Sequence, residues 1–453
     1  MTKQQRIVLL VSIFATFVAG MDGSGVAVAL PAIAQELGGG LATQQWVIDA
    51  YLITLGALML LAGSFSDMYG RKKILAIGLA GFGITSLVCA VAPTAEFLIV
   101  ARALQGVSGA LLVPSSLALI ISAFKGSGQG KAIGTWTAWT GVAYVVGPLL
   151  GGVLVDLLSW RLIFAINVPA VIGTLWLMRR MDVPDTINRQ GKIDILGAVL
   201  CAVGLGGPVY ALIEQANYGW SSPFVYLPLV VGIVSFMSYL VYESRASHPM
   251  LPLHIFTVRN FAVGNLATVA IYAALSVGTF LVTVFLQQVW QFSAVMAGLA
   301  MLPVTLIMFA LSSRFGALAG TFGPRLFMGI GPIVAGCGFL AMLLVGGAPA
   351  YWLQIFPGVL LFGVGLAITV APLTAAVLGS IRSEQAGIGS AVNNAVARVA
   401  GLIAVAAIGV VTGTTLDVTS FQRGLLATAI LLIVGGLISA IGITNKELQS
   451  NTK

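Results

Sequence analysis

The sequence predicts an all-α membrane protein with fourteen transmembrane helices, arranged as two pseudo-symmetric six-helix bundles and one extra pair. Three observations lead to this fold class. Of the 453 residues, 58% are hydrophobic and only 8% are charged, whereas a soluble domain usually carries about 25% charged residues. Apolar runs recur along the chain at the length that one span needs, ~20 residues. Basic residues gather in the short gaps between these runs, as is typical of cytoplasmic loops.

Fourteen apolar segments are long enough to cross a bilayer as helices. They cover approximately residues 7–31, 43–63, 74–92, 97–121, 132–155, 162–180, 193–213, 223–242, 261–287, 295–313, 326–346, 352–377, 385–411 and 423–443. The first segment follows Lys3 and Arg6, as a signal peptide would, but it is too long for one and contains Asp22. We therefore interpret it as a retained span.

The placement of basic residues sets the orientation of these spans. With the N-terminus in the cytoplasm, eighteen of the 22 Lys and Arg residues fall on the inner side. Arg161 and Arg423 fall outside, and Arg102 and Arg398 fall within spans. Removing any one span would place the later basic loops on the outer side, so the distribution favours fourteen spans with both termini in the cytoplasm. The same loops account for the net charge of +8, and we expect no nucleic-acid partner.

Two polar stretches, 179–194 and 242–260, interrupt the apolar pattern and predict cytoplasmic linkers. We therefore divide the chain into an N-terminal bundle (1–180), a central part with the linkers and two extra helices (181–260), and a C-terminal bundle (261–453). The three Cys lie singly in apolar stretches and the two His share one linker, so no metal site is expected.

A short motif occurs at equivalent places in both bundles. Gly63 and Gly70 follow the second span, and Gly316 and Gly323 follow the tenth. Each pair is seven positions apart, with an aromatic residue before the second Gly and an Arg soon after it. Duplicated halves of this kind are typical of transporters.

The first copy supplies the candidate gating residues Gly63, Asp67, Gly70 and Arg71. The glycines permit tight turns and close approach of helix ends. Asp67 could pair with Arg71, or with the N-terminal end of a neighbouring helix, and so latch one bundle to the other in one state. In the second copy Gly320 replaces the acid, which predicts a weaker latch. The alternative is an ordinary positive-inside loop.

Three charged residues are predicted to lie within the membrane. Asp22 in the first span, Asp49 in the second and Arg102 in the fourth all fall in the outer half of the bilayer, at 1.5 Å of rise per residue. An embedded charge is a functional candidate, because insertion costs at least ~2.5–3.5 kcal/mol. A carboxylate held between burial and a cation can take up and release a proton. The alternatives are a static Asp22–Arg102 ion pair and a solvated Asp49 at the mouth of the protein.

Two further groups of residues are candidates. The fifth span carries Gly141, Gly147, Pro148, Gly151 and Gly152. Glycines at these spacings let another helix pack closely, and Pro148 bends its own helix. In the thirteenth span, Asn393, Asn394 and Arg398 could contact substrate, although a structural role is equally compatible with the sequence. Glu214 lies near an outer loop, where we expect it to be solvated.

Taken in order, these motifs resemble those of the major facilitator superfamily. The segment 63–73 resembles its signature loop, and the segment 141–152 resembles the antiporter motif of its exporters. Arg102 with Gln105 and Gly106 resembles the fourth-helix motif, whose Arg is linked to proton transfer in that superfamily.

Other motifs resemble the fourteen-span drug:proton antiporters in particular. These are Met21-Asp22 through Pro31, Trp46 through Tyr51, Trp160-Arg161, Asn167 through Pro169, and Gly389 through Asn394. The resemblance covers essentially the whole chain. It implies the major facilitator fold, proton coupling through Asp22 and Arg102, and substrate contacts that include Asp49 and Tyr51.

The resemblance implies a proton-coupled exporter of lipophilic, often cationic drugs. A dedicated exporter of one metabolite, lipid or peptide would use the same machinery, and a non-transporting receptor or membrane enzyme is a third hypothesis. The sequence contains no nucleophile constellation, phosphate loop or large extramembrane domain. We therefore expect no enzyme activity and no cofactor, with the energy supplied by a proton gradient, although Na⁺ is an alternative coupling ion. The expected partners are a small-molecule substrate, protons and the lipid bilayer, around a monomer in the cytoplasmic membrane.

Overall fold

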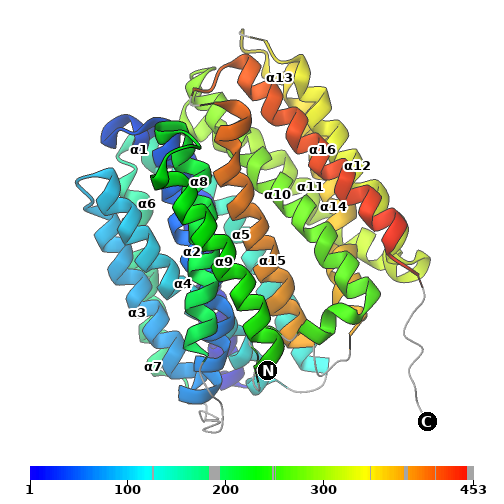
Figure 1. Cartoon of the computed structure of the whole chain (residues 1–453). Helices are drawn as coiled ribbons and strands as arrows, with labels where there is room; N and C mark the ends of the chain where they lie inside the picture. Colours follow the sequence, from blue (N-terminus) through cyan, green and yellow to red (C-terminus); the bar gives the residue numbers. More distant parts are fainter. Residues whose placement is uncertain are drawn as a thin grey trace. The chain divides into compact units, whose positions relative to one another are not determined.

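A computed structural model describes residues 1–124, 127–182, 194–246, 249, 251, 253–346, 348–381, 386–413 and 415–445. Every regular element in these ranges is a helix, which confirms the predicted fold class (Figure 1). Most of the cytoplasmic linker predicted at 179–194 lies outside the described residues.

Thirteen helices within the described residues are long and apolar enough to cross a membrane. They coincide with thirteen of the predicted segments. The remaining segment, 43–63, falls in a helix of 30 residues, α2 (Gly40–Tyr69). The total of fourteen spans therefore stays a prediction, while the multi-pass character of the chain is plain.

The chain forms two compact units. The first contains residues 1–250 and 292–299, and the second contains residues 251–291 and 300–453. One helix, α11 (Ala294–Phe322), begins in the first unit and continues in the second.

The first unit is built from nine helices in the described ranges. In addition to α2 they are α1 (Lys3–Leu37), α3 (Arg71–Ala90), α4 (Ala95–Ala123), α5 (Ser127–Leu157), α6 (Arg161–Ala165), α7 (Asn167–Arg179), α8 (Ile195–Tyr218) and α9 (Pro223–Arg245). The short α6 and the longer α7 together form one candidate span. Helix α1 packs on α4, α5 and α7, and α4 also packs on α2 and α3, so α1 and α4 form the centre of this unit.

The second unit contains the other helices of the described chain. They are η1 (Leu253–Thr257), α10 (Arg259–Gln288), α12 (Pro324–Ala341), η2 (Met342–Leu344), α13 (Tyr351–Gln354), α14 (Phe356–Gly379), α15 (Ala386–Thr412) and α16 (Val418–Gly442). Where α10 ends and α16 begins, the rings of Phe285 and Phe421 stack with 3.9 Å between their centroids. Asp417 caps the start of α16, and hydrogen bonds from Ser420 lower the pKa of its carboxyl.

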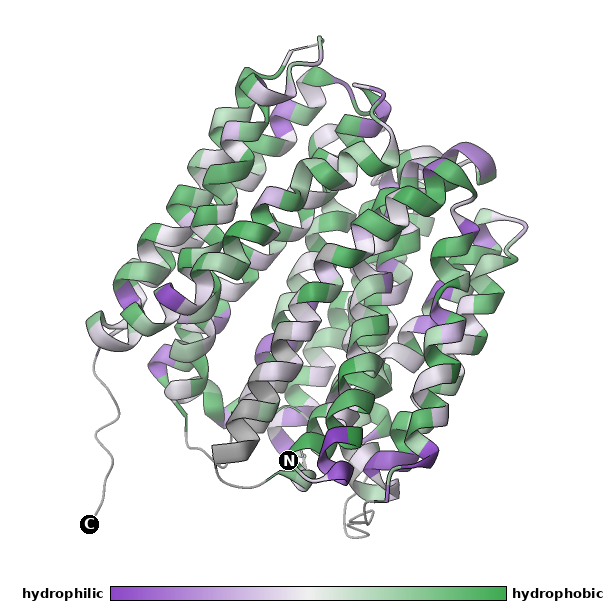
Figure 2. Cartoon of the chain, turned by 180° about the vertical axis from the view of Figure 1, so that it is seen from behind, coloured by the Kyte–Doolittle hydropathy of each residue, from purple (hydrophilic) through white to green (hydrophobic). Residues whose placement is uncertain are grey.

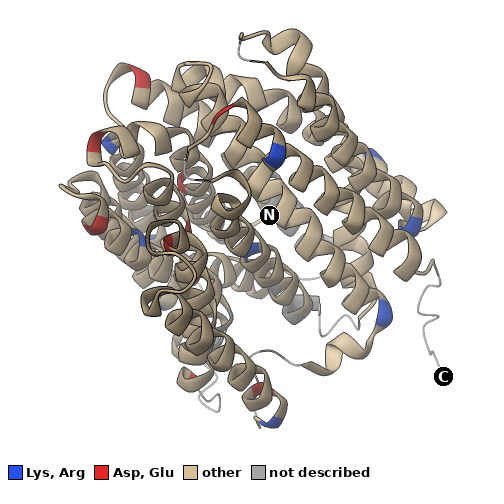
Figure 3. Cartoon of the chain, turned by 45° about the horizontal axis from the view of Figure 1, so that its top comes forward, with Lys and Arg blue, Asp and Glu red and all other residues tan. Residues whose placement is uncertain are grey.

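Hydrophobic residues predominate along the helices (Figure 2), and many of them are exposed. On α9, for example, Phe224, Leu227 and Val234 are more than half exposed. Charged residues are sparse along the helices (Figure 3). A soluble protein rarely exposes so large an apolar surface, so lipid is the environment that these faces require.

Glycines determine how closely the extra pair, α8 and α9, can pack. A Cβ on Gly207 would overlap the carbonyl oxygen of Pro228 and lie 2.8 Å from the Cα of Gly232. A Cβ on the preceding Gly206 would meet only Ile53, at 4.0 Å. The α8–α9 contact is therefore a small-residue contact of the kind that membrane helices use in place of apolar side-chain burial.

We predict that Gly207→Ala lowers the free energy of unfolding by about 1–3 kcal/mol, because the added methyl group overpacks the contact with α9. Thermal unfolding of the purified protein in detergent measures this change. Gly206→Ala is the matched control and should leave the unfolding temperature nearly unchanged. Equal destabilisation by the two variants would contradict the close α8–α9 contact.

Candidate functional site

A buried ion pair lies at the centre of the first unit. Asp22 on α1 and Arg102 on α4 are each 1% exposed, and Arg102 Nη1 donates to Asp22 Oδ2 at 2.7 Å. The sequence predicted that these two residues lie within reach of one another, and the structure brings them into direct contact. Each charge offsets the desolvation penalty that the other would suffer alone.

Two neutral amides complete the environment of the carboxylate. Gln105 Nε2 and Asn167 Nδ2 donate to Asp22 Oδ1 at 3.1 and 2.9 Å. The same two amide nitrogens donate to Ser86 Oγ at 2.9 and 3.3 Å. Ser86, Gln105 and Asn167 are fully buried. Asp22 therefore accepts three hydrogen bonds from three different residues.

The guanidinium of Arg102 is held on several sides. Its Nε donates to the carbonyl oxygen of Val47 at 3.0 Å, and Nη1 also donates to Gln105 Oε1 at 2.7 Å. The rings of Tyr51 and Phe164 lie 4.3 and 5.6 Å from its Cζ. Cation–π contacts of this kind strengthen when water is excluded. Tyr51, a predicted substrate contact, thus packs against Arg102 and is 3% exposed.

Gln105, Asn167 and Ser86 were not predicted as site residues. Gln105 and Asn167 lie in motifs that resemble those of the family, and Gln105, three positions after Arg102, also shares its helix face. Ser86 gave no signal beyond a small polar residue in an apolar span. Together the five side chains form a site that can hold a negative charge away from water and can lose that charge by accepting one proton.

Asp49 lies on α2 but outside this network. It is fully buried, and neither of its carboxylate oxygens has a hydrogen-bond partner among the described residues. The alternative of a solvated residue at the mouth is therefore wrong. Three positions before it, Trp46 donates from Nε1 to Glu214 on α8 at 2.8 Å. Glu214 is therefore a packing partner of α2 rather than only a solvated acid.

The predicted gating segment is more helical than expected. Gly63 and Asp67 belong to the last turns of α2 rather than to a loop, and no atom lies within 4 Å of a Cβ placed on Gly63. Gly70, with φ of 99°, forms the break between α2 and α3. Arg71 Nη1 donates to the carbonyl oxygen of Ala118 on α4 at 3.1 Å. The side chain of Asp67 lies outside the described residues, so the predicted latch stays a prediction.

The predicted antiporter helix, α5, uses its small residues on one side against α1. A Cβ on Gly151 would lie 2.9 Å from the carbonyl oxygen of Gly25, and a Cβ on Gly147 would lie 3.0 Å from the backbone nitrogen of Gly25. Gly141, by contrast, has open space around it. The close packing expected of this motif is thus present at Gly147 and Gly151 but absent at Gly141.

A second row on α5 contacts the first turn of α11. A Cβ on Gly152 would lie 2.7 Å from the Cα of Val295, and one on Gly298 would lie 3.0 Å from the carbonyl oxygen of Pro148. One turn after Gly152, the two carboxylate oxygens of Asp156 accept hydrogen bonds from the backbone N–H groups of Ala294 and Val295, both at 2.8 Å.

Asp156 was not predicted as a site residue, although it is an acid at the end of a glycine-rich helix. Its contact uses the first N–H groups of α11, which have no partner within their own helix. The positive end of the helix dipole also favours a carboxylate at this place. Asp156 is therefore an anchor for the start of α11.

The polar candidates of the second unit, Asn393, Asn394 and Arg398, differ in their contacts and in their exposure. Asn393 on α15 donates from Nδ2 to Asn265 Oδ1 and Thr268 Oγ1 on α10, at 3.1 and 2.9 Å. Asn394 is exposed and donates to the carbonyl oxygen of Ser390 one turn earlier. Arg398 is partly buried. Asn393 thus links two helices, and Asn394 is the most exposed of the three residues.

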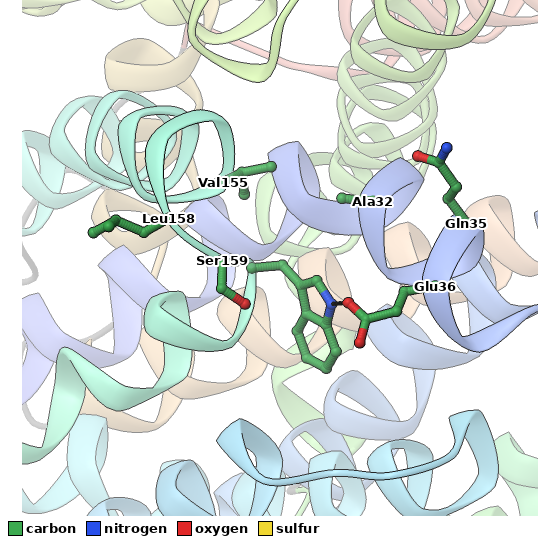
Figure 4. Close-up of a pocket in the computed structure, with 7 residues that line it drawn as sticks. Ala32, Gln35, Glu36, Val155, Leu158 and Ser159 are labelled. Carbon is green, nitrogen blue, oxygen red and sulfur yellow. Dashed lines mark hydrogen bonds between the residues drawn. The ribbon is translucent and has the colours of Figure 1, made fainter.

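A small pocket opens at the end of α1 (Figure 4). It is lined by Ala32, Gln35, Glu36, Val155, Leu158, Ser159 and Trp160. Glu36 accepts from Trp160 Nε1 at 2.7 Å and from Arg161 Nη1 at 2.6 Å. Both carboxylate oxygens of Glu36 therefore already accept hydrogen bonds. These bonds link the end of α1 to the start of α6, which favours a structural role for this pocket over a substrate site.

Within the described residues, the helical architecture, the apolar outward faces and the buried ion pair are those of a multi-pass membrane protein. The chain belongs to the Major Facilitator Superfamily, whose family model matches residues 12–405. This confirms the resemblance that the sequence motifs indicated. It also places the chain among transporters of small molecules rather than among enzymes.

Several curated proteins are similar to the chain over most of its length. The puromycin resistance protein of Streptomyces alboniger is 34% identical over 418 residues, covering 90% of this chain and 82% of that protein. The multidrug resistance protein Stp of Mycobacterium tuberculosis is 30% identical over 426 residues, covering 92% and 78%. The tetracenomycin C resistance and export protein of Streptomyces glaucescens is 30% identical over 407 residues, covering 86% and 72%.

Solved structures of low sequence identity share the fold. A peptide transporter POT in complex with sulfate matches with a TM-score of 0.72 at 14% identity, over 97% of this chain and 94% of that one. The xylose transporter XylE from E. coli, in an inward open conformation, matches with a TM-score of 0.67 at 13% identity, over 98% and 97%.

We predict that Asp156→Asn speeds hydrogen exchange at the backbone N–H groups of Ala294 and Val295 by roughly fivefold, which corresponds to the ~1 kcal/mol that a helix cap contributes. The amide can accept one hydrogen bond but places its own N–H₂ against the second donor. Hydrogen-exchange mass spectrometry of the first turn of α11 measures the change. Glu96→Gln, at an exposed acid on α4, is the control, and equal exchange in wild type and Asp156→Asn would contradict the anchor.

Proposed function

We propose that this transporter exports small lipophilic, cationic drugs across the cytoplasmic membrane in exchange for protons, by alternating access. The observation that carries the proposal is the buried Asp22–Arg102 pair with its amide donors, set in a major facilitator fold. The same proposal includes a monomer with both termini in the cytoplasm, powered by the proton gradient without a cofactor.

The chemistry of the pair supports a proton step at Asp22. Its carboxylate is attracted to Arg102 only while it is ionised. A proton that arrives from the outer side neutralises Asp22, weakens the pairing and favours release of substrate. The bundles then rock, and loss of the proton to the cytoplasm restores the pair and the affinity for substrate.

Asp49 supports the proposed preference for cations. Its buried carboxyl group has no hydrogen-bond partner among the described residues, so a positively charged guest would stabilise the ionised form that burial disfavours. A lipophilic cation could supply that charge and satisfy the apolar surroundings at once. The printed names of the relatives support an export function, because they denote resistance to puromycin, resistance to multiple drugs, and resistance to and export of tetracenomycin C.

A dedicated exporter of one antibiotic is the second candidate function. Two of the relatives described above are named for a single antibiotic, namely puromycin and tetracenomycin C. An efflux screen of dyes, antibiotics and metabolites, in cells that lack their own pumps, distinguishes the two candidates. Export of several unrelated cations supports the first, and export of one compound class supports the second.

We predict that Asp22→Asn abolishes drug efflux driven by a pH gradient in proteoliposomes, because an amide cannot alternate between a charged and a neutral form in this pH range. Removing one partner of a buried ion pair also costs about 3–5 kcal/mol, so folding is checked by size-exclusion chromatography. Asp22→Glu retains an acid and should retain part of the coupled efflux. Full proton-coupled efflux by Asp22→Asn would overturn the assignment of the proton site.

We predict that Asp49→Asn reduces efflux of cationic dyes about tenfold relative to neutral substrates, equivalent to ~1.4 kcal/mol of lost attraction. The substitution keeps the shape of the side chain and removes its charge. Competition assays with paired cationic and neutral substrates measure the ratio. Glu214→Gln, which changes an acid bonded to Trp46 on the neighbouring turn, is the control, and an unchanged substrate profile in Asp49→Asn would count against the role of Asp49.

A further inference from the structure

Asn167 contacts Asp22 from a break in the sixth predicted span. Helix α6 ends at Ala165 and α7 begins at Asn167, with Ile166 between them. The Asn167 amide is fully buried and donates from Nδ2 both to Asp22 Oδ1 and to Ser86 Oγ. Among the described residues, Asn167 is thus the only residue of α7 that donates a hydrogen bond to Asp22.

The oxygen of the Asn167 amide contrasts with its nitrogen. Asn167 Oδ1 is buried and has no hydrogen-bond partner among the described residues. Buried polar atoms are almost always hydrogen-bonded, and an exception calls for an explanation. A carbonyl oxygen beside a carboxylate has no donor to accept from, but it would have one if the carboxylate were protonated.

We propose that Asn167 is a positioning residue that serves both charge states of Asp22, donating N–H to the carboxylate and accepting O–H from the protonated acid. This inference rests on the proposed proton coupling at Asp22. The exchange needs only a turn of the terminal amide about its Cβ–Cγ bond, a torsion with broad, roughly two-fold preferences.

The two arrangements balance in protons and hydrogen bonds. A proton forms an O–H bond at Asp22 Oδ1 and removes the negative charge. The Asn167 amide turns, so Nδ2 gives up its two hydrogen bonds, to Asp22 Oδ1 and Ser86 Oγ, and Oδ1 accepts the new O–H of Asp22. Ser86, whose hydroxyl can donate as well as accept, can donate to the same carbonyl oxygen, which has two lone pairs. Loss of the proton reverses each step.

Gln105 cannot perform this exchange, although it donates to the same carboxylate oxygen. Its Nε2 serves Asp22 and Ser86, and its Oε1 already accepts from Arg102 Nη1 at 2.7 Å and from Cys89 Sγ at 3.6 Å. Turning the Gln105 amide would place N–H₂ against the guanidinium. Gln105 therefore stabilises only the ionised form of Asp22, which makes it a matched control for Asn167.

The ionisable groups around Asp22 set the pH dependence of this exchange. They are Arg102 on α4 in direct contact, Tyr51 on α2 against the opposite side of the guanidinium, and Cys89 on α3 beside Gln105. From α7 the contact is the neutral Asn167, and from α6 it is the ring of Phe164 on Arg102.

The pH profile of drug–proton exchange in proteoliposomes gives the first test. Gln105→Met removes a donor from the ionised form alone, so the pH of half-maximal exchange should rise by about one pH unit. Asn167→Leu removes a partner from both forms, so its pH of half-maximal exchange should shift by less than half of the shift in Gln105→Met. Its maximal exchange rate should fall about tenfold. Asn167→Thr, whose hydroxyl can donate or accept, should recover much of the rate. An Asn167→Leu profile displaced as far as that of Gln105→Met, with an unchanged maximal rate, would overturn the proposal.

Infrared difference spectroscopy between low and high pH gives a test that does not depend on transport. The carboxylic-acid C=O band of Asp22, assigned by its loss in Asp22→Asn, should shift in Asn167→Leu and keep its position in Gln105→Met. An unshifted band in Asn167→Leu overturns the role of Asn167 even if proton exchange is intact. A shifted band in a protein that exchanges no protons overturns the proposed function and leaves the role of Asn167 supported. An Asp22 that stays ionised wherever the protein is folded overturns both.

Discussion

The first unit is organised around one constraint, the need to keep two opposite charges together away from water. Neither Asp22 nor Arg102 could be buried alone at a tolerable cost. Their side chains therefore draw partners from the surrounding helices: Val47 and Tyr51 from α2, Ser86 from α3, and Asn167 from α7. Because these partners lie far apart in the sequence, the ion pair fixes the relative register of α1, α2, α3, α4 and α7 more specifically than apolar packing could.

Close backbone contacts complement this polar centre. Membrane helices gain little from burying apolar side chains against each other, because lipid is equally apolar. The α1–α5 contact at Gly25, Gly147 and Gly151, and the α8–α9 contact at Gly207 and Gly232, instead bring backbones within van der Waals distance. Such contacts leave no room for a side chain at these positions. The ion-pair network and the glycine contacts thus hold the helices of the unit together in two different ways.

The sequence predicted the helices and the ion pair because both leave a strong local signal. An apolar run of ~20 residues has few alternatives to a span, and two opposite charges at similar depth in such runs favour pairing with one another. The neutral residues of the network leave no such signal. Gln105 and Asn167 interrupt apolar runs only mildly, and their partners are set by tertiary contact. Asp49 was ambiguous for the same reason, because its burial depends on the packing of the whole unit around α2 rather than on its own segment. The role of Asp156 depends on the start of α11, which is far from it in the sequence and lies beside it only in the folded chain.

The two units differ in their capacity to hold a proton. Beyond residue 250 the sequence contains only three acids, Glu384, Asp417 and Glu447, and none of them falls within a predicted span. Where the first unit joins its helices through a carboxylate and a guanidinium, the second joins α10 and α15 through the neutral side chains of Asn265, Thr268 and Asn393. Amide and hydroxyl side chains stay uncharged at physiological pH. The proton step that we propose on a membrane-embedded carboxylate is therefore assigned to the first unit, because the predicted spans of the second unit contain no acid.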